Sequence, residues 1–327
     1  MLPELASKSV FLTGATGFIG GYVARRLHEG GGHVLALERT PGKGDGLAAA
    51  GVEIVRGDIN DHARMRELVR GAQIVIHNAA RLSHGRRADF LRDNVEATRN
   101  LAQASADSGV ERFVYVSSVA VYGGIDANSD VDEAMPISLF GDFYGDSKIL
   151  AEQAVCEIAE KSGLSYSIAR PGMVYGPRSP GWTIRLIRLA KRGLLPLLDG
   201  GEGTAHPVYI DDLVKGLLLC ASHPGADGQA FSFVDDGPIT WAQFFGAYMR
   251  MMPTNRALRL PGIIPALLAP LADPFVSIGL RWAVAQLRGK GIVLNRKAKT
   301  VLGWRPEVSL EEGMRRNEQW LREEGWL

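Results

Sequence analysis

The stretch SVFLTGATGFIG, from Ser9 to Gly20, decides the fold of this 327-residue chain. Its first half is a short apolar run typical of a buried strand, and the residues behind it have the pattern of a helix. Gly14, Gly17 and Gly20 permit a tight turn, close approach of the backbone to a phosphate, and close packing of the helix on the strand. A helix N-terminus offers free N–H groups and the positive end of the helix dipole. The stretch therefore predicts a site for the pyrophosphate of a dinucleotide.

Apolar runs and helical segments alternate through the first half of the chain. The predicted strands are Ser9–Gly14, His33–Glu38, Val52–Asp58, Ala72–His77, Arg112–Ser118 and Ser165–Pro171. The predicted helices after the first one are His62–Arg70, Asp89–Gly109 and Tyr144–Ser162. Near-continuous apolar strands separated by helices indicate a parallel sheet that is covered on both faces. We expect an α/β fold with a Rossmann-type doubly wound sheet, and a NAD(P)-binding domain over residues 1–171.

The second half of the chain alternates less clearly after about Gly172, and Pro and Gly become frequent. We predict a smaller, mixed C-terminal substrate domain over 172–327, with a segment near 206–234 returning to the first domain. The apolar stretch Leu258–Leu280 is interrupted by four prolines and carries Asp273, so it is a poor membrane-spanning helix. We expect short helices there that cover a substrate pocket, and a peripheral membrane contact is left open.

The overall composition narrows the class of partner. With 37 basic and 36 acidic residues the formal charge is +1, which gives no electrostatic reason to expect nucleic acid. Two cysteines, Cys156 and Cys220, are too few for a disulfide framework, and we interpret both as small buried apolar residues. The opening residues lack the features of a signal peptide, so a cytoplasmic protein is expected. We expect no metal site.

The end of the second predicted strand bears on the choice of dinucleotide. Glu38 stands there, where a carboxylate accepts hydrogen bonds from the adenosine ribose and repels a 2′-phosphate. Arg39 follows, and an arginine could instead pair with that phosphate. We favour NAD, with NADP as the alternative. Asp58, at the end of the third strand, is placed to meet the adenine amino group. His77 ends the fourth strand, where packing explains it better than a role in the site.

The stretch FYGDSK places Tyr144 and Lys148 four positions apart, on one face of a helix. Such a pair also arises by chance, but here Ser117 and Ser118 stand at the carboxyl end of the fifth strand, beside the expected cofactor. A nearby ammonium lowers the pKa of a phenol, which is otherwise close to 10. Tyr144 could then exchange a proton with a substrate alcohol or carbonyl during hydride transfer, while Ser118 orients the substrate oxygen.

Taken together, these motifs resemble the extended short-chain dehydrogenase/reductases, the NAD(P)-dependent epimerase/dehydratase and 3β-hydroxysteroid-dehydrogenase-like group. The resemblance covers nearly the whole chain and follows the family order: TGATGFIG, HNAA, NVEATRNL, VSSVAVYG, YGDSK, ARPGMVYGP, HPVYIDDL and LGWRPEVSLEEG. It implies that Ser118, not Ser117, is the catalytic serine and that Asn94 supports the active site. It also implies that the backbone of Pro171–Val174 holds the nicotinamide. Many members dimerise through the two long helices, so a homodimer is expected.

The expected site residues follow from the motifs and the resemblance. The catalytic residues are Ser118, Tyr144 and Lys148. The cofactor-binding residues are Gly14, Gly17, Phe18, Ile19, Gly20, Glu38, Arg39, Asp58, Ile59, Asn78, Ala79, Ala80, Tyr144, Lys148, Pro171 and Val174. Substrate contacts are expected from Ser118, Trp182 and His206, although interdomain packing for Trp182 and a loop-holding role for His206 compete. Trp282 is expected in the core.

The second half of the chain departs from family members that act on nucleotide-diphosphate sugars. Those members usually carry an arginine six residues before the first Asp of the V-x-D-D motif, and Ala205 stands here. Val119 and Ala120 replace the acid pair that dehydratases usually carry. We therefore expect an NAD(P)-dependent oxidoreductase that interconverts a secondary alcohol and a ketone on a hydrophobic or medium-sized substrate. An epimerase that keeps its NAD bound is the alternative, and a non-catalytic dinucleotide sensor is a remote one.

Overall fold

The computed structural model describes residues 3–123, 129–253, 256–265 and 280–327, without the side chains of residues 3 and 280–283. Seven strands form the main sheet, and every neighbouring pair is parallel. In spatial order they are β11 (Gln229–Phe233), β6 (Tyr166–Pro171), β5 (Arg112–Val116), β4 (Ile74–His77), β1 (Ser9–Thr13), β2 (His33–Glu38) and β3 (Glu53–Arg56). The Rossmann-type doubly wound sheet is confirmed, with its crossover between β1 and β4.

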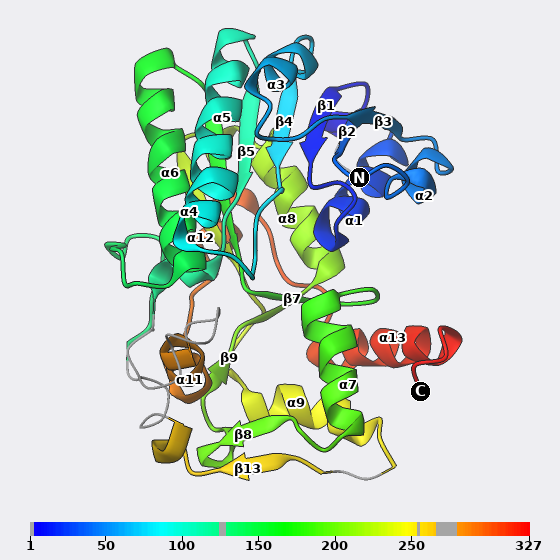
Figure 1. Cartoon of the computed structure of the whole chain (residues 1–327), viewed down its shortest axis with the longest axis vertical. Helices are drawn as coiled ribbons and strands as arrows, with labels where there is room; N and C mark the ends of the chain where they lie inside the picture. The colour runs from blue at the N-terminus through cyan, green and yellow to red at the C-terminus, as the bar shows by residue number, and fades with distance from the viewer. Residues whose placement is uncertain (1–2, 124–128, 254–255, 266–279) are drawn as a thin grey trace.

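Helices cover both faces of this sheet (Figure 1). On one face lie α1 (Phe18–His28) and α8 (Ile210–Ser222), and on the other α3 (His62–Leu68), α5 (Ala97–Asp107) and α6 (Phe143–Ser162). Successive strand residues point to opposite faces. Val10 and Leu12 of β1 therefore belong to one apolar cluster, while Phe11 belongs to the other. The short α2 (Asp45–Ala48) lies between β2 and β3 along the chain.

The predicted helix Asp89–Gly109 is wrong as a continuous α-helix. The chain forms α4 (Arg87–Phe90), a π-helical segment η2 (Leu91–Glu96) and then α5. A π-turn inserts one extra residue per turn and is common at functional sites. Here it buries Asn94, whose side chain bonds the backbone of Arg81, so the family asparagine takes its place through the wider turn.

The second domain is built from short strand pairs and helices. Its strands are β7 (Met173–Tyr175) beside β10 (Pro207–Tyr209), β9 (Thr204–Ala205) beside β12 (Ile239–Thr240), and β8 (Pro196–Leu198) beside β13 (Leu258–Leu260). Its helices are α7 (Arg185–Lys191), α9 (Trp241–Arg250), α11 (Leu280–Arg288), α12 (Arg296–Leu302) and α13 (Leu310–Glu323). Shorter turns are η1 (Pro3–Leu5), η3 (Val119–Tyr122), η4 (Pro180–Ile184), η5 (Asp199–Gly201) and η6 (Pro224–Ala226).

The apolar stretch Leu258–Leu280 differs from the expectation where the structure describes it. It begins with strand β13 and not with a helix, because its backbone pairs with β8. Residues 266–279 and the Trp282 side chain lie outside the described part, so the predictions for them are not addressed. Within the described ranges, no helix has both the length and the apolar character needed to cross a membrane.

Hydrogen bonds to helix α8 connect the C-terminal segment to the first domain. The Asp212 carboxylate accepts hydrogen bonds from the backbone N–H groups of Glu307 and Val308, each at 3.0 Å. The indole N–H of Trp304 donates to the Asp212 carbonyl at 2.8 Å, and its fully buried ring packs on Phe233. Asp212 is therefore a structural residue that joins the two parts.

Candidate active site

The turn between β1 and α1 requires glycine at two of its three positions. Gly14 has φ 71°, and a Cβ there would lie 2.8 Å from the backbone nitrogen of Ala79. A Cβ on Gly20 would lie 2.2 Å from the Gly14 carbonyl oxygen. At Gly17 the nearest atom would be 3.2 Å away, and no side chain caps the helix that begins behind it. The free N–H groups of this helix end fit a dinucleotide pyrophosphate.

The floor of the cofactor region is formed by the ends of β1 and β4. Ala79 donates its N–H to the Thr13 hydroxyl at 3.2 Å, and the Asn78 side-chain amide donates to the Gly14 carbonyl at 3.4 Å. His77 is fully buried between the hydroxyls of Thr13 and Thr98, at 2.7 and 2.8 Å. Burial lowers the pKa of His77 to about 3, so it is a neutral packing residue.

Glu38 makes two contacts within the protein at the end of β2. Its carboxylate is buried, and one oxygen accepts the backbone N–H of Gly44 at 2.6 Å. The other oxygen lies 3.8 Å from the guanidinium of Arg56 on β3. Arg39 is exposed. The Glu38 carboxylate therefore bonds the backbone of the 39–44 loop. The side chains of Arg39 and Arg56 are exposed beside it.

The other predicted cofactor residues lie along the same sheet edge. Asp58 is exposed, and one carboxylate oxygen accepts the backbone and side-chain N–H groups of Asn60 at 2.9 and 3.1 Å. Ile59 is buried beneath it. Phe18 and Ile19 form the first turn of α1, and Ala80 is half-buried after β4. Pro171 and Val174 are buried at the end of β6 and in β7.

The three residues predicted to be catalytic, Ser118, Tyr144 and Lys148 (the trio), lie where β5 ends and α6 begins. Asp142 caps α6 by accepting the Gly145 N–H at 2.7 Å, which fixes Tyr144 in the first turn. The Ser118 hydroxyl accepts the Ala120 N–H at 3.1 Å and lies near enough to Tyr144 to lower the pKa of that phenol. Lys148 is 2% exposed and donates to the Val116 carbonyl at 2.7 Å, with its ammonium 5.9 Å from the centre of the Tyr144 ring.

Burial shifts both titrating groups of the trio. It raises the pKa of Tyr144 to about 12, although the nearby Ser118 hydroxyl acts in the opposite direction. It lowers the pKa of Lys148 to about 7, while the negative charge of Glu152 opposes this shift. Near neutral pH the phenol is therefore protonated and ready to donate, and the lysine is close to its titration point.

Comparison with known proteins identifies the family of this chain. The sequence profile of the NAD dependent epimerase/dehydratase family matches residues 10–233. This chain belongs to that family. It is 29% identical to the UDP-glucose 4-epimerase of Vibrio cholerae, over 95% of each protein. It is 26% identical to the 2-alkyl-3-oxoalkanoate reductase of Shewanella oneidensis, over 96% of this chain and 87% of the relative.

A solved structure, MoeE5 in complex with UDP-glucose and NAD, is similar over the whole fold. Its TM-score is 0.77 at 26% identity, with 97% of this chain and 99% of that chain covered. The chain is an NAD-dependent enzyme of the extended short-chain dehydrogenase/reductase type. Its relatives include both reductases and epimerases, so membership alone leaves the reaction open.

Two groups of residues support helix α6 next to the trio. The sequence predicted the first, Asn94, but not the second, the pair Glu152 and Arg170. Asn94 bridges Ser147 of α6, at 2.9 Å, to the backbone of Arg81. Behind Lys148, Glu152 forms a buried two-pronged ion pair with Arg170, at 2.6 and 3.0 Å. The sequence analysis missed this pair, although Glu152 lies one turn beyond Lys148 and Arg170 is in the quoted ARPGMVYGP motif.

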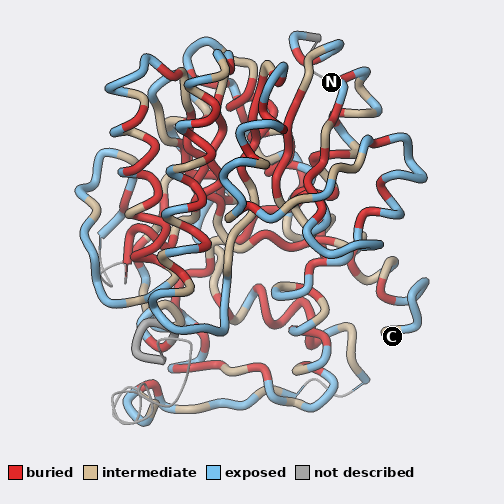
Figure 2. Tube along the Cα trace, turned by 45° about the horizontal axis from the view of Figure 1, so that its top comes forward, coloured by how far each residue is buried: buried red, intermediate tan, exposed pale blue. Residues whose placement is uncertain are grey.

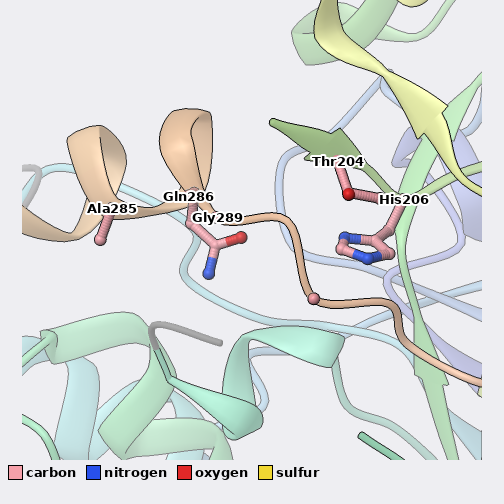
Figure 3. Close-up of a pocket in the computed structure, with 6 residues that line it drawn as sticks. Thr204, His206, Ala285, Gln286 and Gly289 are labelled. Carbon is pink, nitrogen blue, oxygen red and sulfur yellow. The ribbon is translucent and has the colours of Figure 1, made fainter. Parts of the chain in front are cut away.

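The expected substrate residues lie apart from one another. Trp182 packs on Trp241, with ring centres 6.1 Å apart, inside the second domain. His206 accepts the Val293 N–H at 3.2 Å and lines a recess with Thr204, Gln286 and Gly289 (Figure 3). The sequence analysis missed Gln286, whose side-chain amide donates to the Gly123 carbonyl at 2.9 Å. No motif marks this glutamine, so only the fold shows that α11 reaches the VYG turn.

Proposed function

We propose that this protein is an NAD(P)-dependent oxidoreductase that interconverts a secondary alcohol and a ketone on a hydrophobic or medium-sized substrate. The Tyr144 hydroxyl gives its proton to the substrate oxygen in the reducing direction and takes it back in the oxidising direction. Ser118 holds the same oxygen through its hydroxyl. Lys148 places a positive charge beside the phenol. The bound dinucleotide supplies or accepts the hydride.

The observation that carries this proposal is the uncharged recess around Ala205. The family's arginine for a substrate diphosphate would stand here, and Ala205 is 2% exposed instead. The recess beside it is lined by Thr204, His206, Ala285, Gln286, Gly289 and Gly291, and its accessible volume is about 0 Å³, so the surrounding chain fills it. Burial lowers the pKa of His206 to about 4, so it adds no positive charge at neutral pH.

The chain itself fills the neighbourhood of this recess. Thr204 donates its N–H to the Gly289 carbonyl at 2.7 Å and its hydroxyl to Lys290 at 3.1 Å. A Cβ on Gly203 would lie 2.3 Å from the Leu287 carbonyl oxygen. A diphosphate needs cationic or N–H partners and room to enter. These contacts support a smaller or less charged substrate.

The test is NADH or NADPH absorbance at 340 nm with purified protein and a panel of medium-chain ketones, cyclic ketones and UDP-sugars. We expect net oxidation with a hydrophobic ketone, and a loss of at least about 100-fold in Tyr144→Phe. Tyr166→Phe removes a hydroxyl distant from the trio, bonded to Cys156, and is the matched control. Interconversion of UDP-sugars with no net absorbance change would replace the proposal with the epimerase alternative, which the Vibrio cholerae relative supports.

We also propose a homodimer formed through α5 and α6. The two helices lie side by side on one face of the sheet, and the exposed pair Arg99 and Glu157 joins their outer surfaces. Light scattering after size exclusion tests this. A mass of twice 35.4 kDa is expected, and a monomer at micromolar concentration would contradict it.

A further inference from the structure

The end of the second domain carries a basic and apolar face outside the active site. It consists of Arg192, Leu194, Arg256, Leu258, Arg259 and Ile263, which we call the basic–apolar face. All six side chains are exposed, with Leu258 at 41% and Ile263 at 61%. Figure 1 places β8 and β13 at the end of the long axis, opposite the seven-stranded sheet. Figure 2 shows exposed and half-exposed residues along this edge.

Backbone pairing holds these residues together. Leu258 pairs with Pro196 in register and donates its N–H to the Leu195 carbonyl at 2.9 Å. A Cβ on Gly193 would lie 3.1 Å from the Arg256 side chain, so the lead-in to β8 touches the lead-in to β13. The chain segments that carry these cations and aliphatic side chains therefore lie side by side, with Leu258 and Arg259 on opposite faces of β13.

The two segments that form this face carry no acidic residue of their own. The sequence has no Asp or Glu between Glu160 and Asp199, and none between Asp236 and Asp273. The nearby Asp199 accepts the Gly262 N–H at 2.7 Å and pairs with Arg288 at 2.9 Å, so its charge is compensated. The chain as a whole has a formal charge of only +1. The basic residues are thus concentrated where aliphatic side chains are exposed.

We propose that the basic–apolar face docks this protein onto an anionic lipid bilayer. Arginines beside exposed leucine and isoleucine match a surface that has negative headgroups above an apolar layer. A second copy of the chain fits the basic–apolar face less well than a bilayer does, because two such faces in contact would bring like charges together. A protein partner is also poorer, because none of the six described residues of this face is aromatic, and leucine is under-represented among the residues that dominate binding at protein interfaces.

The test is flotation of the full chain with vesicles of phosphatidylcholine alone or with 30% phosphatidylserine, at 50 and 150 mM salt. We expect binding to the anionic vesicles that weakens with salt. The double variant Arg256→Glu, Arg259→Glu should lose at least about 20-fold in binding, since each cation contributes roughly fivefold. Ile263→Asp should also weaken binding.

The matched control is Arg66→Glu with Arg70→Glu, the same charge change on exposed residues in and just after α3, at the opposite end. It should float like the unchanged protein, and NADH binding measured on all variants verifies that they are folded. Failure to float with either vesicle, or equal loss in the control, would overturn the proposal. So would a dimer in analytical ultracentrifugation that Ile263→Asp abolishes, which would assign the face to a second copy. The assay needs no substrate and is independent of the proposed reaction.

Discussion

Lys148 is a buried ammonium with three close features: the Val116 carbonyl, the faces of two tyrosine rings, and Glu152 one turn away. Its ammonium lies 4.8 Å from the centre of the Tyr115 ring and 5.9 Å from that of Tyr144. Burial lowers the pKa of Lys148 to about 7, and Glu152 limits the shift. The charge that assists Tyr144 is therefore present below about pH 7 and is lost as the pH rises through that value.

The first prediction concerns the pH profile of ketone reduction at saturating NADH. We expect kcat/KM to fall as pH rises through about 7, because Lys148 loses its proton. Glu152→Gln removes the charge that raises this pKa, so the falling limb should move to lower pH. Glu157→Gln, an exposed position on the same helix, should leave the limb in place. A limb that is unmoved or moves upward in Glu152→Gln would contradict this electrostatic account.

The second prediction concerns Arg39. The Glu38 carboxylate disfavours a 2′-phosphate even while it accepts the Gly44 N–H, whereas the exposed Arg39 beside it favours one. Arg39→Ala should weaken NADP binding by about tenfold, the effect of a lost charge-assisted hydrogen bond, and leave NAD binding nearly unchanged. Dissociation constants from tryptophan fluorescence measure both, with Arg66→Ala as the control. Equal losses for NAD and NADP would show that Arg39 does not contact the phosphate.

At the scale of elements, local pattern predicted most of the first domain. His33–Glu38 was predicted with its observed bounds, and the other strands of that half differ by one or two residues at an end, because pairing covers less than the apolar run. The π-segment Leu91–Glu96 escaped prediction, since its residues suit an α-helix and only Asn94's bonds to Arg81 favour the wider turn. β13 was not predicted because it pairs with β8, which lies about 60 residues earlier in the sequence.

The third prediction separates folding from binding within the α1 turn. Gly20→Ala places a Cβ 2.2 Å from the Gly14 carbonyl, so it should destabilise the fold, measured by urea unfolding. Gly17→Ala meets its nearest atom at 3.2 Å and should fold, yet lose dinucleotide affinity because the methyl group faces the phosphate. Gly21→Ala, at 3.5 Å, is the control. Full NAD affinity in Gly17→Ala would mean that the pyrophosphate lies elsewhere.

At the scale of the molecule, the motifs predicted three residues that lie together in the structure, but of the residues that line the recess they marked only His206. Ser118, Tyr144 and Lys148 lie in contiguous motifs, and the order of strands brings them together. The recess, by contrast, joins Gly123, His206 and Gln286, which are far apart in the chain and belong to no shared pattern. Substrate contacts depend on how α11 and the loop after it pack against the first domain. The periodicity of apolar residues in the sequence does not predict this packing.

The fourth prediction concerns acid stability of the whole fold. The folded pKa of His77 is about 3, below its ordinary value of 6.5, so the unfolded state binds more protons between these values. Stability is therefore lost as pH falls below 6.5, by about 2 kcal/mol at pH 5 from this residue. Urea unfolding at pH 7.5 and 5.0 measures the loss. His77→Asn should show a smaller loss, whereas the exposed His33→Asn should match the unchanged protein.

The most direct test of the proposed reaction follows the hydride itself. Purified protein is incubated with NADH deuterated at C4 and the most active ketone, and the released alcohol is analysed by mass spectrometry. We predict one deuterium per alcohol, equal in amount to the NADH oxidised, and none with Tyr144→Phe. Unchanged NADH, together with interconversion of UDP-glucose and UDP-galactose by the same protein, would contradict the oxidoreductase account and assign the trio to epimerisation.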